Sequence, residues 1–501
     1  MIQRFRKLFL PLVLTTGILA GCASNADSNK AEEASSLKVM HYDERSFYQQ
    51  YGMLFTALHP NVDIEVISTQ SVRPEEGQDY EKMMLDYIEE QKPDVVMLDV
   101  NQYEKMAADG KLVELDPYIE KDKFDVEGIL PGVIEYLKEK GNGSLYGLTP
   151  EFYSQAIYYN KDLFDRYNIE YPKDKMTWEE LLHLASLFPS DGSGKDRIYG
   201  LKAGYQTSLY ELGSTIGMAS DLNFVDTNSL QVTINTDSWK SIFETALMAI
   251  KSGTLYSEDP NDMNGSFNTY EDYLMRDPFI SGRVAMMLEG TYMLNELKQA
   301  SDNLKDKAVA NWDLVTVPVN PQSPDTSTYV NFHNIFAIHA SAENRDAAWD
   351  FIKYIHSDEY AHVASKANSG NFPIRTKYIK DDEGRNLAAF YALKPAQPQM
   401  YRDYQKLPEM FMSQFYQLSN DEMKAAEDGS KTVSEALETL QTKLDKLMLE
   451  AKQKEEAGAV DADKEAGGEA GAGDGAGAGD GAEAGSTDAA AQEGTPAEAA
   501  E

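Results

Sequence analysis

The spacing of apolar and polar residues between positions 37 and 98 changes in a regular order. Three short apolar or alternating runs predict strands, at Leu37–Met40, Val62–Ile67 and Asp94–Leu98. Two amphipathic segments between them predict helices, at Phe47–Leu58 and Tyr80–Gln91, and a proline follows shortly after each. The third run is short and almost wholly apolar, which is typical of a strand buried in a parallel sheet. The order strand, helix, strand, helix, strand predicts an α/β sheet with helices on both faces.

Capping boxes mark two helix starts further along the chain. In Thr177-Trp178-Glu179-Glu180 the threonine can accept from the Glu180 amide while the Glu180 side chain reaches back. Thr432 and Glu435 repeat this pattern. The helix that follows has one apolar face, which consists of Val433, Leu437, Leu440, Leu444 and Leu447. Further amphipathic helices are predicted at Asp237–Lys251 and Glu343–His356.

The start of the chain has the pattern of an export signal. Three basic residues precede an apolar run from Leu8 to Ala20, which is too short to span a bilayer. The run ends in Leu19-Ala20-Gly21-Cys22, which resembles the lipobox of bacterial lipoproteins, and Cys22 is the only cysteine of the chain. We therefore expect residues 1–21 to be a lipoprotein signal peptide, Cys22 to carry a lipid, and residues 22–36 to be a polar tether.

Charge and composition separate the other end from the rest. The 501 residues include 83 acidic and 46 basic ones, a formal net charge of −37. Residues 456–501 are nearly all Ala, Gly, Asp and Glu and contain no aromatic residue. They cannot bury enough apolar surface to offset their ordering entropy, so we predict a disordered acidic tail. So acidic a chain should repel the phosphates of nucleic acid, and we expect no nucleic-acid partner.

Patterns of catalysis and metal binding are mostly missing from the sequence. One cysteine excludes disulfides within the chain, Cys-based zinc sites and iron–sulfur clusters. Asp262, Asn264 and Glu271 have the later spacing of an EF-hand loop, but Pro260 fills the first ligand position and has no side-chain oxygen. We expect no metal and no cofactor. Glu151 and Glu289 leave one enzymatic alternative open, the facing carboxyl pair of a surface glycosidase.

Five segments in order carry a family resemblance. They are Gly143–Pro150 with Ala156–Phe164, Pro172 with Thr177–Leu181, Gly282–Tyr292, Ala347–Ile355 and Gly370–Arg375. They resemble segments of the extracellular solute-binding proteins of ABC importers, in particular the carbohydrate-binding group that includes maltose-binding protein. The family patterns are G-x-x-Y-G-x-P…YNKDLF, P…T-W-x-E-L, G-K/R-x-A-M…G-x-W/Y, AAW-x-F-I-K-F/Y-I/L and G-x-x-P-V/I-R. The first has one extra residue here, before its proline.

The resemblance implies an α/β, two-lobed periplasmic-binding-protein-like fold, with hinge-connected discontinuous lobes and a ligand cleft between them. The N-terminal lobe would comprise 37–150 plus 326–372, and the C-terminal lobe 151–325 plus 373–455. The lobes would close on the solute about a hinge, and the closed form would dock on the membrane permease of an ABC importer. We expect a monomeric, lipid-anchored receptor without enzymatic activity, with an oligosaccharide as the favoured solute. The non-enzymatic alternative is a lipoprotein that binds or senses a peptide or another non-sugar solute.

Sugars present C–H faces and hydroxyls, so a sugar site needs aromatic rings beside polar side chains. The resemblance places Tyr292, and also Tyr205 with Gln206, where related proteins present an aromatic ring to the solute. A packed core tyrosine is the rival interpretation for Tyr292 and Tyr205. Tyr158, Trp178 and Trp349 are expected in the core.

Further candidates follow from their places in the predicted fold. Those at the first crossing between lobes are Glu151, Phe152 and Tyr153. Asp99 and Asn101 follow a strand's carboxyl end, the usual place for ligands in α/β sheets. Arg375 could bind a carboxylated sugar with both guanidinium nitrogens, or pair with an acid of the protein.

The sequence departs from the family at two places that bear on specificity. Many members have a Gly-Gly turn where this chain has Asn331-Phe332-His333-Asn334, so His333 and Asn334 either contact the ligand or narrow the site. Tyr292 replaces a tryptophan that is frequent in carbohydrate-binding members.

Overall fold

The computed structural model describes residues 35–74, 80–189, 192, 197–204, 207–258, 269–366, 370–381, 383–397 and 406–468. The chain divides into two compact units, one of residues 1–222 and 241–400 and one of residues 223–240 and 401–501. Cys22 with the predicted signal peptide, Tyr205, Gln206 and most of the EF-hand-like segment lie outside the described residues. Within the described part, no helix has both the length and the apolar character that crossing a membrane requires.

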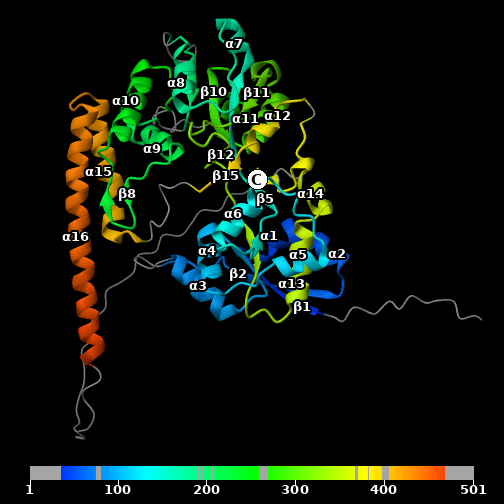
Figure 1. Ribbon diagram of the computed structural model, residues 1–501. Helices are drawn as coiled ribbons and strands as arrows, with labels where there is room; N and C mark the ends of the chain where they lie inside the picture. The colour runs from blue at the N-terminus through cyan, green and yellow to red at the C-terminus, as the bar shows by residue number, and fades with distance from the viewer. Residues whose placement is uncertain are drawn as a thin grey trace, which may run out of the picture. The chain divides into compact units, whose positions relative to one another are not determined.

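The first unit contains a five-stranded sheet in the order β2-β1-β3-β13-β4 (Figure 1). Its strands are β1 Ser35–His41, β2 Val62–Ser68, β3 Val95–Leu98, β4 Gly147–Leu148 and β13 Ile335–Ile338. The three predicted strands are confirmed. β1 begins at Ser35, so the last two residues of the predicted tether, 35 and 36, belong to this strand. β1 is parallel to β2 and β3, whereas β13 is antiparallel to β3 and β4. The sheet is therefore mixed, and a strand from far along the chain occupies its interior.

Helices follow the strands of this sheet in the order that the sequence predicted. They are α1 Glu44–Phe47, α2 Met53–Leu58, α3 Tyr80–Gln91, α4 Val100–Ala108, α5 Asp116–Asp122, α6 Val133–Lys140, α13 Arg345–Ile355 and α14 Asp358–Ala364. A π-helical turn, η1 Tyr48–Gly52, joins α1 to α2, so the predicted helix over 47–58 is a composite of three parts. The periodicity of the sequence did not predict that turn.

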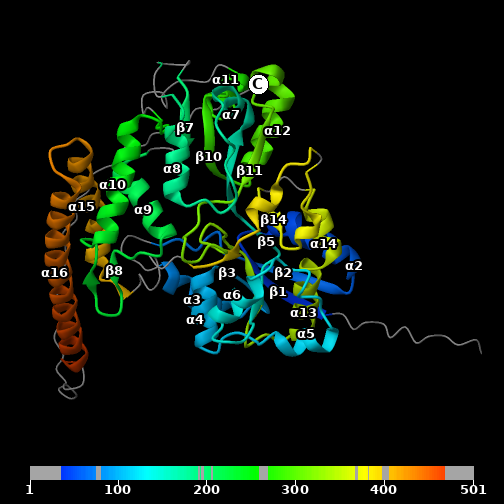
Figure 2. The ribbon, with the colours of Figure 1, turned by 45° about the horizontal axis from the view of Figure 1, so that its top comes forward.

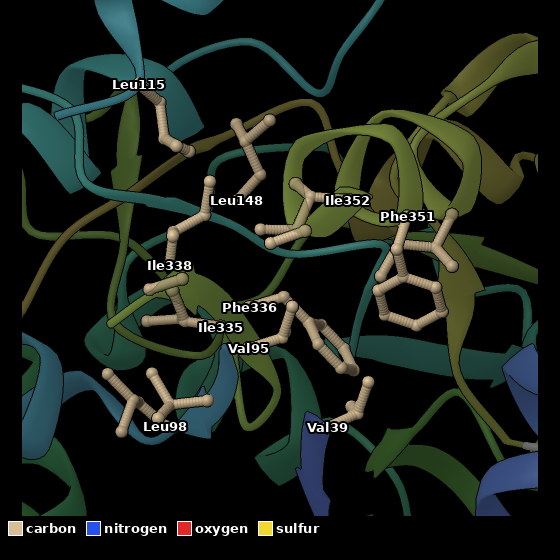
Figure 3. Packing of buried hydrophobic residues seen from close by; sticks show 14 of the residues in the cluster. Val39, Val95, Leu98, Leu115, Leu148, Ile335, Phe336, Ile338, Phe351 and Ile352 are labelled. Carbon is tan, nitrogen blue, oxygen red and sulfur yellow. The ribbon is translucent and has the colours of Figure 1, made fainter. Parts of the chain in front are cut away.

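The core of this sheet is apolar and mostly aliphatic (Figure 3). Val39 of β1, Val95 of β3 and Phe336 of β13 are fully buried, and all four residues of β13 are buried. Phe351 of α13 packs against Phe336, with ring centroids 6.1 Å apart. The apolar face that predicted α13 thus closes one side of the sheet.

A second sheet in the first unit has the order β11-β6-β10-β7 (Figure 2). Its strands are β6 Gln155–Asn160, β7 Tyr199–Lys202, β10 Val284–Gly290 and β11 Trp312–Val315. β6 is antiparallel to β10 and β11, and β10 is parallel to β7. The helices along this stretch of the chain are α7 Lys161–Tyr167, α8 Trp178–Ser186, α9 Leu209–Ala219, α10 Asp237–Ser252, α11 Tyr270–Arg276 and α12 Met293–Leu304.

This second sheet has an apolar core of its own. Tyr158, Phe279, Met287 and Trp312 belong to it, and none of its buried members comes from the first sheet. The predicted capping box at the start of α8 is confirmed, because the Thr177 hydroxyl accepts from the Glu180 amide at 3.2 Å. Tyr158, Trp178 and Trp349 are buried as expected.

Short connections join the two sheets at one place. β5 Glu151–Phe152 pairs antiparallel with β14 Phe372–Pro373, and Tyr153 forms an isolated bridge with Asn331. A further short pair, β12 Thr326–Ser327 with β15 Lys394–Pro395, is parallel. Three segments that are distant in sequence therefore lie side by side around Glu151.

The second unit contains a small hairpin and two long helices. Its elements are β8 Val225–Asp226, β9 Gln231–Val232, α15 Glu409–Glu427 and α16 Val433–Gly468. The predicted capping box at Thr432 is confirmed, and all five residues of the predicted apolar face of α16 are buried. The backbone helix continues past Glu456, the predicted start of the tail, while residues 469–501 lie outside the described part.

Candidate functional site

A pocket of about 370 Å³ opens in the first unit beside the end of β10. It is lined by Lys202, Tyr256, Glu258, Tyr273, Leu274, Arg276, Asp277, Pro278, Ile280, Tyr292, Met293 and Glu296. These residues come from the end of β7, the segment after α10, α11 with the turn that follows it, and the start of α12. Three tyrosine rings beside charged side chains give the mixed lining that small-molecule sites require.

Tyr292 is the predicted site residue that lies in this pocket. β10 is buried along almost its whole length and ends at Gly290, and Tyr292 then occupies the N-cap position of α12. Gly370 lies against the backbone of Tyr292. A Cβ atom added to Gly370 would lie 3.4 Å from the Cβ atom of Tyr292. The Thr291 hydroxyl donates to the Gly370 carbonyl oxygen. Two of the sequence segments that carry the resemblance, 282–292 and 370–375, therefore meet here and fix the Tyr292 backbone.

A buried ammonium organises one wall of the pocket. The Nζ of Lys202 lies 3.0 Å from Oδ2 of Asp277 and 3.9 Å from Oε2 of Glu289. The other carboxylate oxygen of Asp277 accepts from the amides of Phe279 and Ile280, at 2.8 and 3.0 Å. These bonds hold the turn after α11 and commit Asp277 to a structural role.

The remaining charged side chains of the lining differ in how they are paired. Arg276 forms an ion pair with Glu258. Glu296, on the first turn of α12, makes no hydrogen bond or ion pair with any residue in the described part of the chain. Partial burial, together with the charges of Asp277 and Glu289, raises the pKa of Glu296, although Lys202 acts in the opposite direction.

A second polar cluster surrounds Glu151 at the crossing between the sheets. Its Oε1 accepts from Nδ2 of Asn334 at 3.2 Å. Burial raises the pKa of Glu151, although the neighbouring side chains of Asn371, Asn334 and Tyr51 favour the charged form. Glu151 in turn raises the pKa of Tyr51 and of Tyr360, in both of which burial is the larger cause. The cluster thus brings the three crossing segments close to Tyr51 of the π-helical turn and Tyr360 of α14.

The other candidates at this crossing have different surroundings. Phe152 is buried and packs against Phe372, with ring centroids 5.8 Å apart, so it contributes to the core. Tyr153 is half-buried and its side chain lies against Gly290. A Cβ atom added to Gly290 would lie only 1.9 Å from the hydroxyl oxygen of Tyr153. Gly290 is therefore needed for Tyr153 to lie at the strand end that precedes Tyr292. His333 is exposed and Asn334 is half-buried.

Three candidates lie apart from the pocket. Asp99 is the N-cap of α4, in a capping box in which its Oδ1 accepts from the Gln102 amide at 2.9 Å. Asn101 is exposed on the first turn of the same helix. Arg375 is buried and donates to Asp125 and to the His356 carbonyl oxygen, at 3.1 and 2.7 Å. It therefore takes the second of its two predicted roles, pairing with an acid of the protein.

The structure also bears on the enzymatic and metal alternatives. Glu289 borders the pocket through Lys202, while Glu151 is held by Asn334, so the two carboxyl groups have separate partners. Among the residues that the structure describes, no group of His, Cys, Asp or Glu side chains is arranged to hold a metal ion.

Most lining residues of the pocket were missed from the sequence. Tyr256 and Tyr273 belong to no motif, and they meet Tyr292 through tertiary packing across separate elements. Asp99 carried a local signal that could have been recognised, because Asp99 and Gln102 fit the capping-box spacing.

The fold and the site together define a class of protein, an α/β binding protein for a small solute. The chain belongs to the bacterial extracellular solute-binding proteins, whose family model matches residues 34–362. This family is not enzymatic, so the glycosidase alternative is set aside.

Known relatives are distant in sequence. A Brucella abortus protein named as a binding protein is 22% identical over 402 residues, which cover 76% of this chain and 86% of that protein. A maltooligosaccharide ABC transporter solute-binding lipoprotein of Streptococcus pneumoniae is 22% identical over 321 residues, or 61% of this chain and 65% of that protein.

Solved structures share the fold. A sugar transporter protein of Rhizobium etli in an open conformation has a TM-score of 0.59 at 22% identity, covering 82% of this chain and 99% of that one. The sugar-binding protein MalE of Xanthomonas citri has a TM-score of 0.58 at 17% identity, covering 84% and 99%. The predicted α/β periplasmic-binding-protein-like fold is confirmed.

Proposed function

We propose that this protein captures a sugar, with an oligosaccharide as the favoured solute, outside the cytoplasmic membrane and delivers it to an ABC import permease. The observation that carries the proposal is the position of Tyr292 in a pocket that also contains Tyr256 and Tyr273. Tyrosine rings offer flat faces to sugar C–H groups, and the charged side chains around them can bond hydroxyls. Relatives with sugars in their names support the same solute class.

We also propose that the chain forms the two predicted lobes, 37–150 plus 326–372 and 151–325 plus 373–455, with residues 223–240 and 401–455 of the second lobe belonging to the second compact unit. Each sheet has a separate apolar core, which supports this division. The crossing segments around Glu151 would then form the hinge, and closure about it would enclose the solute.

The anchor is a separate part of the proposal. Cys22 follows a short apolar run and a lipobox-like sequence, and one relative is named a lipoprotein. A single acyl chain binds membranes only marginally, and stable anchoring takes two signals, which a diacylglyceryl group would supply. Cell fractionation tests this. Wild-type protein should be in the membrane fraction and the Cys22→Ser variant should not, and wild-type protein without lipid by mass spectrometry would refute the anchor.

A non-sugar solute, such as a peptide, is the second candidate, favoured by the number of charged side chains in the pocket. A thermal-shift screen over oligosaccharides, uronates, peptides and polyamines separates the two. A ligand at a hundred times its Kd should add about 2.7 kcal/mol to the free energy of unfolding. We expect the largest shift with a sugar. A shift with peptides alone would replace the proposed solute class.

A further inference from the structure

Among the residues that the structure describes, acidic side chains outnumber basic ones in and beside the pocket. Four carboxylates lie in or beside it with three cations, and these seven residues are Glu258, Asp277, Glu289, Glu296, Lys202, Arg276 and Arg283, the last of which lies 6.0 Å from the centre of the Tyr256 ring. When all are ionised, one negative charge is in excess. Because partly buried charges are screened less than exposed ones, this excess acts on whatever enters the pocket.

Ion pairs account for most of these charged side chains, and Glu296 is the carboxylate that they leave over. Glu258 is paired with Arg276, and Asp277 with Lys202. Glu289 accepts from the Gly290 amide at 3.0 Å with one oxygen, and its other oxygen lies 3.9 Å from Lys202. Within the described part of the chain, Glu296 is the lining carboxylate that has no hydrogen bond and no ion pair.

The position of Glu296 relates it directly to the aromatic part of the site. It lies four residues after Tyr292 on the same helix start, and residues at this spacing are neighbours on one helix face. A group bound by this carboxylate would therefore lie close to the Tyr292 ring. Tyrosine ring faces attract cations as well as sugar C–H groups. Since Asp277, Glu289 and Lys202 all act on Glu296, a bound cation would relieve the repulsion among the three acids.

We propose that Glu296 is a specificity-determining residue that binds an ammonium group of the solute, and that the solute is therefore an amino sugar with a free amine. The inference rests on the proposed function and narrows its solute class. A uronate would meet repulsion from the same carboxylates. A polyamine would satisfy Glu296 but would offer no ring face to the tyrosines.

The test is calorimetric titration of the purified full chain with matched ligands. Glucosamine is compared with glucose, and the β-1,4-linked glucosamine disaccharide with cellobiose, which has hydroxyls in place of the amines. Spermidine serves as an amine without a ring. The titrations are made at about pH 6, below the ordinary pKa of roughly 7.7 to 8.0 of an α-amino group, so that the amines are charged.

We expect each amino sugar to bind at least about tenfold more tightly than its neutral counterpart, a difference of about 1.4 kcal/mol. Glu296→Gln should abolish this preference and Glu296→Asp should retain part of it. Asp302→Asn is the matched control, because it removes one negative charge from an exposed position on the same helix. It should leave the preference unchanged.

The outcomes separate this inference from the proposed function. If neutral sugars bind as tightly as amino sugars, or if the preference survives in Glu296→Gln, the inference is wrong while sugar binding stands. If spermidine alone binds, or if no sugar of either kind binds here or in the thermal-shift screen, both are wrong.

Discussion

Tyr292 combines two properties that suit a stacking residue, a backbone fixed by its neighbours and a half-buried ring that lines the pocket. Its backbone caps α12 and packs against Gly370, while its side chain lines the pocket. If truncation exposes about 100 Å² of apolar surface in the complex, Tyr292→Ala should weaken sugar binding by roughly 2.5 kcal/mol, or about 60-fold. Calorimetric titration with the best sugar from the screen measures this.

Two controls accompany the Tyr292 prediction. Tyr171→Ala removes an exposed aromatic side chain of the first unit that does not line the pocket and whose ring contacts, Tyr159 and Phe164, do not line it either, and it should leave affinity unchanged. Tyr292→Phe keeps the ring face and should weaken binding less than alanine does. Were Tyr292→Ala to bind normally, or to lose several kcal/mol of folding stability as a core tyrosine would, the stacking role would be refuted.

His356 should make the first unit sensitive to acid. It is fully buried, its Nδ1 donates to the Ile352 carbonyl oxygen at 2.6 Å, and burial lowers its pKa from 6.5 to about 4. Below pH 6.5 the unfolded chain binds a proton that the folded chain rejects, so stability falls as the pH drops toward 4. This corresponds to about 3 kcal/mol at 1.36 kcal/mol per pKa unit.

Melting temperatures measured across this pH range check the His356 prediction. His356→Gln cannot take up the proton, so its stability should fall less steeply than that of the wild type between pH 6.5 and 4. His183→Gln changes an exposed histidine and should follow the wild-type curve. Parallel curves for the wild type and His356→Gln would contradict the assignment.

The role of a residue could be predicted where it depends on neighbours in the sequence. It could not be predicted where the residue's hydrogen-bond or ion-pair partner lies far away along the chain. A motif placed Tyr292 after the strand that became β10, and the structure puts it in the lining of the pocket. Arg375 has the same sequence context whether it binds a solute or Asp125, and Asp125 lies 250 positions away. The sequence therefore could not decide between its two roles.

Helices α15 and α16 form a pair that depends on one buried carboxylate. Glu422 of α15 is 4% exposed and accepts from Lys431 and Lys443, at 2.5 and 2.6 Å. Burial alone would raise the pKa of Glu422, but these two lysines hold it below its ordinary value. Glu422→Ala removes the shared partner and should destabilise the second unit by about 1–3 kcal/mol.

Urea unfolding followed by helical circular dichroism measures this change. Glu438→Ala serves as the control, because Glu438 is an exposed acid on α16, and it should change stability by less than about 0.5 kcal/mol. An equal effect of the two substitutions would show that the ion-pair network contributes nothing.

Element boundaries were predictable where start and stop signals are encoded nearby. The helix expected over Tyr80–Gln91 has those bounds in the structure, and both predicted capping boxes are present. The π-helical turn at Tyr48–Gly52 was missed because the buried residues Phe47, Tyr51 and Phe55 have the four-residue spacing of an ordinary α-helix. β13 was missed as a partner of β3 because strand pairing across 240 positions has no local signal.

At the scale of the whole molecule, the acidic tail should be separable from binding. Residues from 456 onward hold 12 acidic residues and no aromatic one, and residues 452–454 of α16, which precede them, are half-buried or exposed. A chain that stops at Glu455 should keep the melting temperature and the sugar affinity of the full chain. A tenfold loss of affinity or a large drop in melting temperature would show that the tail takes part.

The fold was predictable as a whole and the pocket was not. Five motifs in order gave the family, and the family implied the α/β architecture that the structure has. The pocket combines Lys202, Tyr256, Tyr273 and Glu296 from four separate segments. Each is an ordinary residue of its segment, and only the tertiary arrangement brings them together.

A crystal structure of the protein with its best-binding sugar would show whether Tyr292 stacks on the solute. We expect a sugar ring against the face of Tyr292, inside the pocket formed by the end of β7, α11 and the start of α12. A sugar bound elsewhere on the chain, with none in the Tyr292 pocket, would contradict this role of Tyr292.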